Sequence, residues 1–210
     1  MEVDDPSRFA QVFKVDSSRK TNWDYTSPGI YFITICAVHH NKFFGKIIDN
    51  KMVLSLMGTI ANQELLNTFK IRKNILLHEY VIMPNHVHIL MEILNNNNKS
   101  SYRRDVLQNV STIKNMNVST NKKTEKFSIR KISEAEKIYF SNISPKSNSV
   151  SNIIKMYKSA VTRIINPKTV FFGWQPRFHD EIIKDKNQLI STKTYIQNNP
   201  KNWHKDEYNK

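Results

Sequence analysis

The amino-acid sequence predicts an α+β domain with a ferredoxin-like βαββαβ antiparallel sheet, and three observations support this fold class. Several runs rich in β-branched and aromatic residues have the composition of buried strands. Two stretches carry apolar residues at helical spacing. Strands and helices also alternate in the order that this fold requires, once an extra N-terminal hairpin and a C-terminal helix are set aside. We expect the helices of the βαββαβ unit to cover one face of the sheet.

Each element is predicted from a local pattern of residues. Apolar runs of about eight residues indicate strands, apolar residues three and four apart indicate helices, and Asn-Pro pairs mark helix ends. In chain order, the predicted elements are a strand at 30–38, a hairpin at 43–56 that turns at Asp49-Asn50, a helix at 57–69, strands at 75–83 and 86–94 joined by a Pro84-Asn85 turn, a helix from 150 to the Asn166-Pro167 stop, a strand at 177–183 and a helix at 188–198.

Two segments fall outside this scheme. Residues 1–28 are mixed in charge with scattered aromatic residues, and we expect an N-terminal arm that packs on the rest of a single domain spanning 1–210. Residues 95–149 form an insert rich in Asn, Ser and Lys, with eleven Lys and Arg against four Asp and Glu. Such a composition buries little apolar surface, so we expect the insert to be mobile in part. A DNA-contacting insert and an ordinary solvated one both remain open.

Composition narrows the class of protein. The 210 residues include 32 Lys and Arg against 18 Asp and Glu, a net charge of +14 that favours a polyanionic binding partner. The alternative is a soluble protein whose charge only reflects a Lys- and Asn-rich proteome. The single cysteine, Cys36, excludes an internal disulfide and a cysteine-based zinc finger. No apolar run reaches the ~18 residues of a membrane span, and the acidic N-terminus does not resemble a signal peptide. We therefore expect a cytoplasmic protein without membrane association.

The pair His86 and His88 is the strongest chemical signal in the sequence. On a strand, residues two apart project from the same face, so both imidazoles are predicted to lie side by side. Two neutral imidazole nitrogens make half of a divalent-metal site. In a strongly basic chain, such a site favours phosphodiester chemistry, although two buried structural histidines are the alternative.

The last predicted helix supplies a candidate nucleophile. Tyr195 and Asn199 are four residues apart, so they share one face of that helix. A tyrosine hydroxyl has an unperturbed pKa of about 10, so attack near neutral pH requires a nearby positive charge. The Asn199 carbonyl oxygen suits Mg²⁺ or Mn²⁺. The alternative is a core tyrosine followed by a helix-ending asparagine.

Four sequence blocks together resemble a known family. Residues 81–91 (VIMPNHVHILM) look like the HUH motif region of single-tyrosine transposases. Three later blocks resemble, in the same order, those of the REP-associated tyrosine transposase branch: 151–166 (SNIIKMYKSAVTRIIN), 174–183 (WQPRFHDEII) and 195–203 (YIQNNPKNW). The HUH triplet alone is weakly specific, whereas four ordered blocks are strongly specific. The N-terminal arm and the 95–149 insert lie outside the resemblance.

The resemblance implies roles for particular residues. His86 and His88 match the two metal-binding histidines, and Tyr195 matches the nucleophile that joins covalently to a DNA 5′ phosphate. Asn199 stands where relatives carry a polar third ligand, often a longer Gln. The implied activity is that of a transposase, a Mg²⁺- or Mn²⁺-dependent endonuclease and strand transferase that cuts single-stranded DNA next to hairpins. Relatives are monomers or homodimers.

Candidate DNA contacts are basic residues interleaved with aromatic ones in the later blocks. We expect backbone phosphate contacts and base stacking from five of them, namely Lys158, Arg163, Trp174, Arg177 and Lys184. A solvated basic face with core aromatics is the alternative. Two other functions stay open: a domesticated, catalytically weak DNA-binding protein, and an RNA-associated metal protein.

Overall fold

The computed structural model describes residues 8–9, 13–14, 23–95, 148–166 and 171–209. Most of the predicted N-terminal arm (1–28) and of the predicted insert (95–149) lies outside the described residues, so what the sequence indicates for them stays a prediction. In chain order, the elements are β1 (Arg8–Phe9), β2 (Phe13–Lys14), β3 (Gly29–Cys36), η1 (Val38–His40), β4 (Gly45–Ile48), β5 (Lys51–Leu54), α1 (Leu56–Lys70), β6 (Ile75–Ile82), β7 (His86–Ile93), α3 (Val150–Ile165), β8 (His179–Ile183), α4 (Lys186–Asn198) and η5 (Trp203–Lys205).

The main sheet has four strands in the order β6-β7-β3-β8, and every neighbouring pair is antiparallel. Apart from the β4–β5 hairpin, the chain order up to the last strand is βαββαβ, made by β3, α1, β6, β7, α3 and β8. The central strand β3 is paired with β7 along its whole length, from Gly29 opposite Ile93 to Cys36 opposite His86. The predicted ferredoxin-like antiparallel sheet is therefore confirmed.

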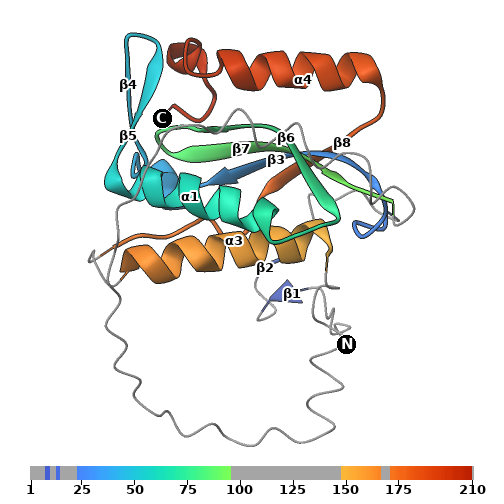
Figure 1. The fold of residues 1–210 in the computed structure, drawn as a ribbon. Coiled ribbons are helices and arrows are strands. Elements are labelled where there is room, and N and C mark those ends of the chain that lie inside the picture. Colours follow the sequence, from blue (N-terminus) through green and yellow to red (C-terminus); the bar gives the residue numbers. More distant parts are fainter. Residues whose placement is uncertain (1–7, 10–12, 15–22, 96–147, 167–170, 210) are drawn as a thin grey trace, which may run out of the picture.

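Helices lie on both sides of this sheet (Figure 1). α1 and α3 pack together on one face, over a large buried core that includes Tyr31, Ile33 and Tyr157. α4 crosses the opposite face, where Ile196 packs with Leu90 and other apolar residues. The two helices of the βαββαβ unit share one face as predicted, and α4 lies on the other.

Local sequence signals explain where these elements begin and turn. Asp49 and Asn50 both have positive φ values, 49° and 61°, and such left-handed residues make the tight turn between β4 and β5. Each long helix starts with a side chain that accepts a hydrogen bond from a backbone N–H of the first turn: Ser55 for α1, Ser149 for α3 and Asp185 for α4. The Asp185 cap places the start of α4 two residues before the predicted helix.

The residues just after β3 and just before it contact the rest of the domain. After β3 ends at Cys36, Ala37 forms an isolated bridge with Trp174, and His39 and His40 adopt positive φ values. Trp23, in the predicted N-terminal arm, donates a hydrogen bond to the Tyr31 hydroxyl and packs on the core. Among the described helices, none combines the length and apolar character needed to cross a membrane.

Candidate active site

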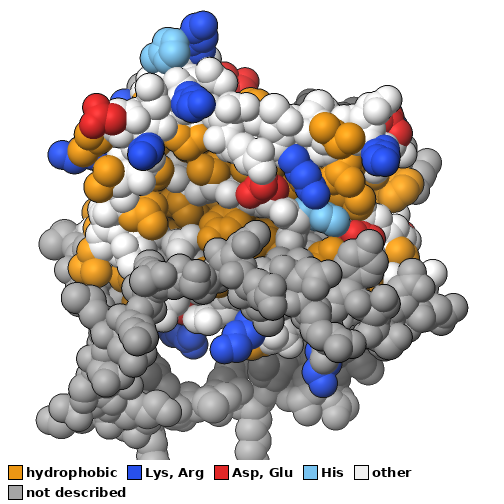
Figure 2. Space-filling view, turned by 45° about the horizontal axis from the view of Figure 1, so that its top comes forward, with side chains coloured by type: hydrophobic (Ala, Val, Ile, Leu, Met, Phe, Trp, Pro, Cys, Tyr) orange, Lys and Arg blue, Asp and Glu red, His pale blue; other side chains and the backbone are white. Residues whose placement is uncertain are grey.

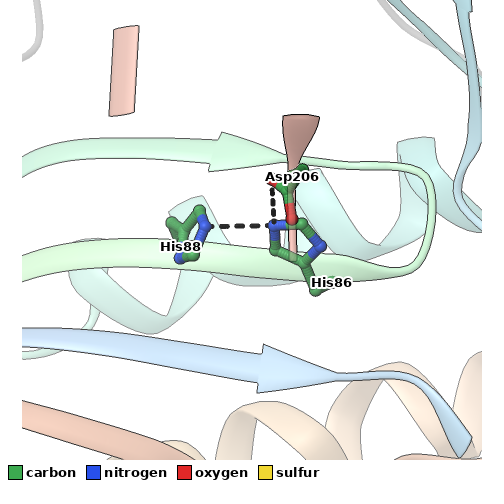
Figure 3. Close-up of side chains that lie close together, drawn as sticks. All are labelled: His86, His88 and Asp206. Carbon is green, nitrogen blue, oxygen red and sulfur yellow. Dashed lines mark hydrogen bonds and ion pairs between the residues drawn. The ribbon is translucent and has the colours of Figure 1, made fainter. Parts of the chain in front are cut away.

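The candidate site lies on the face of the sheet that α4 covers. His86 and His88 project from β7 toward this face, and their Nε2 atoms are 3.0 Å apart (Figure 3). Both imidazoles are buried, with exposed fractions of 0% and 1%. The strand period predicted their shared face, and the structure brings the two rings into direct contact.

Each histidine is held through its other ring nitrogen. The Nδ1 atom of His86 lies 2.9 Å from Asn85 Oδ1, and the Nδ1 atom of His88 lies 2.8 Å from Thr34 Oγ1. Thr34 is the residue of β3 directly opposite His88 in the sheet. Hydrogen bonds at Nδ1 orient each ring so that Nε2 points into the site, which is the usual arrangement of metal-binding histidines.

Burial keeps both imidazoles neutral. Desolvation lowers the pKa of His86 well below its ordinary value of 6.5, and the neighbouring His88 and His40 lower it further. Desolvation also lowers the pKa of His88, to about 3. Neutral imidazoles carry the lone pairs that bind metal ions, so the pair is ready to act as ligands near neutral pH.

Asp206 is a third group at this site. Its Oδ2 atom lies 3.9 Å from His86 Nε2, and one ligand atom from each of His86, His88 and Asp206 lies within 4.8 Å of the other two (Figure 3). The Asp206 side chain is 2% exposed, and within the described part of the chain Oδ2 has no hydrogen-bond partner. Burial raises the pKa of this carboxyl above its usual value, partly offset by hydrogen bonds from Tyr208 N and Asn199.

Tyr195 and Asn199 come from α4 and its C-terminal cap. The Tyr195 hydroxyl lies 3.4 Å from His88 Nε2, and its ring packs against Phe32 and His88. Burial raises the pKa of the Tyr195 hydroxyl, and the charges of Asp206 and Glu207 raise it further, whereas a hydrogen bond with Asn199 lowers it. The four predicted residues of the metal and nucleophile set are thus gathered around one point.

The donor set fits a divalent cation. Two neutral Nε2 atoms face each other, and a buried carboxylate oxygen lies beside them. The Asn199 side-chain oxygen is also buried without a partner among the described residues. A cation that binds these atoms would satisfy Asp206 Oδ2 and Asn199 Oδ1, the two oxygens of the site that have no hydrogen-bond partner in the described part of the chain. His86, His88 and Asp206 could therefore hold a metal ion, and mixed nitrogen and oxygen ligands suit Mn²⁺ and Mg²⁺ as well as Zn²⁺.

Comparison with known proteins relates this geometry to a known fold. No protein-family model matches the chain. A protein of Haemophilus influenzae, described only as uncharacterized, is 28% identical over 197 residues, which cover 91% of this chain and 91% of that protein. A solved structure of a REP-associated tyrosine transposase bound to a REP hairpin has a TM-score of 0.50 at 12% identity and covers 88% of this chain and 74% of the transposase.

The chain has the fold of a REP-associated tyrosine transposase. The resemblance predicted from the four sequence blocks is confirmed at the level of the fold. Within the REP-associated transposase fold, β7 carries the histidine pair of this chain and α4 carries Tyr195.

Two of the predicted DNA contacts, Lys158 and Trp174, are half-buried and make hydrogen bonds within the protein. Lys158 Nζ donates hydrogen bonds of 2.7 Å to the carbonyl oxygens of Gln175 and Arg177, and burial lowers its pKa to about 8. Trp174 donates from its indole nitrogen to the Lys158 carbonyl and packs against Phe44. Both residues hold the 174–177 segment against α3, and their contact with DNA stays a prediction.

The other three predicted DNA contacts lie at the surface. Arg163, Arg177 and Lys184 are exposed, and Arg163 is in the last turn of α3. Figure 2 shows one face of the molecule, on which Lys and Arg side chains are scattered among hydrophobic and uncharged ones instead of forming one patch. The described residues visible on that face form no continuous basic track, and the DNA-binding role of these residues also remains a prediction.

Sequence reasoning missed three residues of the site. Asp206 lies in the C-terminal segment after η5, where no spacing relates it to the histidines. Asn85 was assigned only to a turn, and Thr34 only to a strand. The pairing of β3 with β7 was the one available signal, because it places Thr34 directly across from His88.

Proposed function

We propose that this chain is a REP-associated tyrosine transposase, a metal-dependent nuclease and strand transferase that acts on single-stranded DNA next to hairpins. The observation that carries the proposal is the position of the Tyr195 hydroxyl, 3.4 Å from His88 Nε2, which is itself 3.0 Å from His86 Nε2. A phenol next to a group of candidate metal ligands is an arrangement in which a bound cation could activate the hydroxyl for attack on a phosphate. The solved transposase of the same fold is bound to a REP hairpin, and we propose hairpin DNA as the substrate class here.

His86, His88 and Asp206 are the proposed ligands of a divalent metal, Mg²⁺ or Mn²⁺, with Asn199 as an additional oxygen ligand. When bound, the metal supplies positive charge that polarises the scissile phosphate and favours the ionised phenol. Tyr195 needs such a charge, because burial and the nearby Asp206 and Glu207 hold its pKa above the ordinary value.

The proposed step exchanges one phosphoester bond for another. The Tyr195 oxygen attacks the scissile phosphorus and loses its proton, and the bond from phosphorus to the 3′ oxygen breaks. The 3′ oxygen leaves with a proton as a free 3′-OH, and the DNA 5′ phosphate stays on Tyr195 as a phosphotyrosine. Attack by a second 3′-OH reverses the step and joins a new strand, so no nucleotide cofactor is required.

Replacing the proposed nucleophile tests this mechanism. Single-stranded DNA with a hairpin and a 3′ label is incubated with the protein and Mg²⁺ or Mn²⁺, because the fragment on the 3′ side of the cut is the one that stays on Tyr195. Covalent adducts are then separated on a denaturing gel. We expect an adduct with the wild-type protein and none with Tyr195→Phe. Tyr208→Phe is the matched control, because the Tyr208 ring lies 4.8 Å from the His86 ring and its variant is expected to keep the adduct. An adduct that persists in Tyr195→Phe shows that the nucleophile is another residue.

A second candidate function is hairpin binding without cleavage. The burial of both imidazoles favours it, because exposed fractions of 0% and 1% leave no direct path for a phosphate in this conformation. Hairpin binding by a gel-shift assay, with no adduct in either metal, supports this second function against the first. Adduct formation excludes it.

A further inference from the structure

Asn85 occupies the turn between β6 and β7, directly before His86, and its side chain is fully buried. Its amide nitrogen Nδ2 donates two hydrogen bonds, one to the His40 carbonyl at 3.1 Å and one to the Tyr208 carbonyl at 2.6 Å. Carbonyl oxygens accept and never donate, so only the NH₂ end of the amide can face them. The orientation of the Asn85 amide is therefore fixed by two independent partners.

This orientation determines the proton position on His86. The other end of the amide, Oδ1, lies 2.9 Å from His86 Nδ1 and can only accept a hydrogen bond. His86 must therefore carry its proton on Nδ1. A neutral imidazole has a single N–H, so His86 Nε2 carries a lone pair and accepts the hydrogen bond that His88 Nε2 donates in the metal-free protein. That lone pair points toward His88 Nε2, 3.0 Å away, and Asp206 Oδ2, 3.9 Å away.

The same amide also holds the segment that carries Asp206. Tyr208, whose carbonyl accepts the 2.6 Å hydrogen bond, is two residues after Asp206. The Tyr208 backbone N–H donates to Asp206 Oδ1 at 2.8 Å, which leaves Oδ2 directed toward the histidines. Asn85 is thus connected to one candidate ligand through its acceptor end and to a second through its donor end.

We propose that Asn85 is the positioning residue of the metal centre, which fixes His86 as the Nδ1–H tautomer and holds Asp206 beside it through the Tyr208 carbonyl. This inference rests on the proposed function, because it requires that His86 and Asp206 bind a metal. Residues that orient metal ligands in this way contribute roughly 10–100-fold to metal affinity. Neither the turn position of Asn85 nor its spacing in the sequence indicates this role.

Two substitutions separate the parts of the proposal. Asn85→Leu keeps the size of the side chain and removes all three hydrogen bonds. Asn85→Asp, in its ionised form, keeps an acceptor for His86 Nδ1 but removes both donors. Thr68→Ala is the matched control, because Thr68 is also a buried hydrogen-bonding residue but lies on α1, which covers the other face of the sheet. Mn²⁺ affinity is measured by calorimetry for each full-length protein, and ¹⁵N NMR of labelled histidines reports the tautomer of His86 without metal.

We expect the Nδ1–H tautomer of His86 in the wild-type protein and in Asn85→Asp. Asn85→Leu is expected to bind Mn²⁺ roughly 10–100-fold more weakly than the wild type. Thr68→Ala is expected to bind Mn²⁺ with the same affinity as the wild type. In Asn85→Asp, amide hydrogen exchange at residues 203–209 should become faster, because the Tyr208 carbonyl has lost its donor. If Asn85→Leu does not fold, the His86 tautomer in the wild type and the amide hydrogen exchange at residues 203–209 in Asn85→Asp still test the positioning role of Asn85.

The outcomes distinguish this inference from the proposed function. A wild-type protein that binds no Mn²⁺ refutes the metal centre and the positioning role together. A wild-type protein that binds Mn²⁺, with Asn85→Leu within about twofold of it, refutes the positioning role alone. An Nε2–H tautomer of His86 in the wild type, or unchanged exchange at 203–209 in Asn85→Asp, also overturns the positioning role.

Discussion

Replacement of Asp206 by Asn separates metal binding from fold stability. In the metal-free protein the Asp206 carboxylate is buried, and its Oδ2 atom has no hydrogen-bond partner among the described residues. Burial raises the pKa of this carboxyl, so the folded state disfavours the charged form, and the free energy of unfolding falls as the pH rises through that pKa. At pH 7 the neutral amide of Asp206→Asn removes this cost, and the metal-free variant should be at least as stable as the wild type.

The metal reverses the order of stability. At a free Mn²⁺ concentration of about 100 times the dissociation constant, binding adds about 2.7 kcal/mol to the free energy of unfolding. For a chain of this length, that increase corresponds to a rise of about 5–11 °C in Tm. Loss of the carboxylate should weaken binding by on the order of 100-fold, since loss of an outer-shell partner alone costs 10–100-fold. At the same Mn²⁺ concentration, Asp206→Asn then gains only about 0.4 kcal/mol, or about 1 °C.

Thermal unfolding followed by circular dichroism, with chelator and with Mn²⁺, measures both effects. The wild type should show a large Mn²⁺-dependent rise in Tm, and Asp206→Asn a small one. An equal rise in both proteins at the same Mn²⁺ concentration refutes the assignment of Asp206 as a ligand. A metal-free variant that unfolds well below the wild type refutes the stated cost of the buried carboxylate.

Three further predictions follow from the buried and exposed charges. Because the pKa of His88 is lowered from 6.5 to about 3, only the unfolded state binds a proton at this residue between these pH values, and the free energy of unfolding of the metal-free protein should fall by about 2 kcal/mol between pH 7 and pH 5. Urea unfolding of the wild type and of His88→Gln at both pH values measures this fall, and an equal pH dependence in the two proteins contradicts it. Lys158→Met should lower the free energy of unfolding by about 2–3 kcal/mol, because two carbonyl oxygens lose a charged donor; an unchanged urea midpoint argues against a structural role. Lys184→Met should reduce the salt dependence of single-stranded DNA affinity by about one unit of slope if Lys184 contacts a phosphate, and an unchanged slope excludes that contact.

The sequence by itself determined the features that depend on local periodicity. The period of two along a strand placed His86 and His88 on one face, and the helical period placed Asn199 one turn after Tyr195. The turn residues Asp49 and Asn50 marked where the hairpin reverses, and the Asn166-Pro167 pair marked the end of a helix. These features follow from backbone geometry within a few residues, so they are available without knowledge of the fold.

Only the tertiary structure decided which distant residues meet. It placed α4 on the same face of the sheet as the histidine pair, so that Tyr195 lies beside His88 across 107 residues of chain. It also brought Asp206 to His86, gave Asn85 three partners, and turned Lys158 inward onto the 174–177 segment. No local pattern encodes such contacts, because they depend on how the strands pair and on where the chain passes after the last helix.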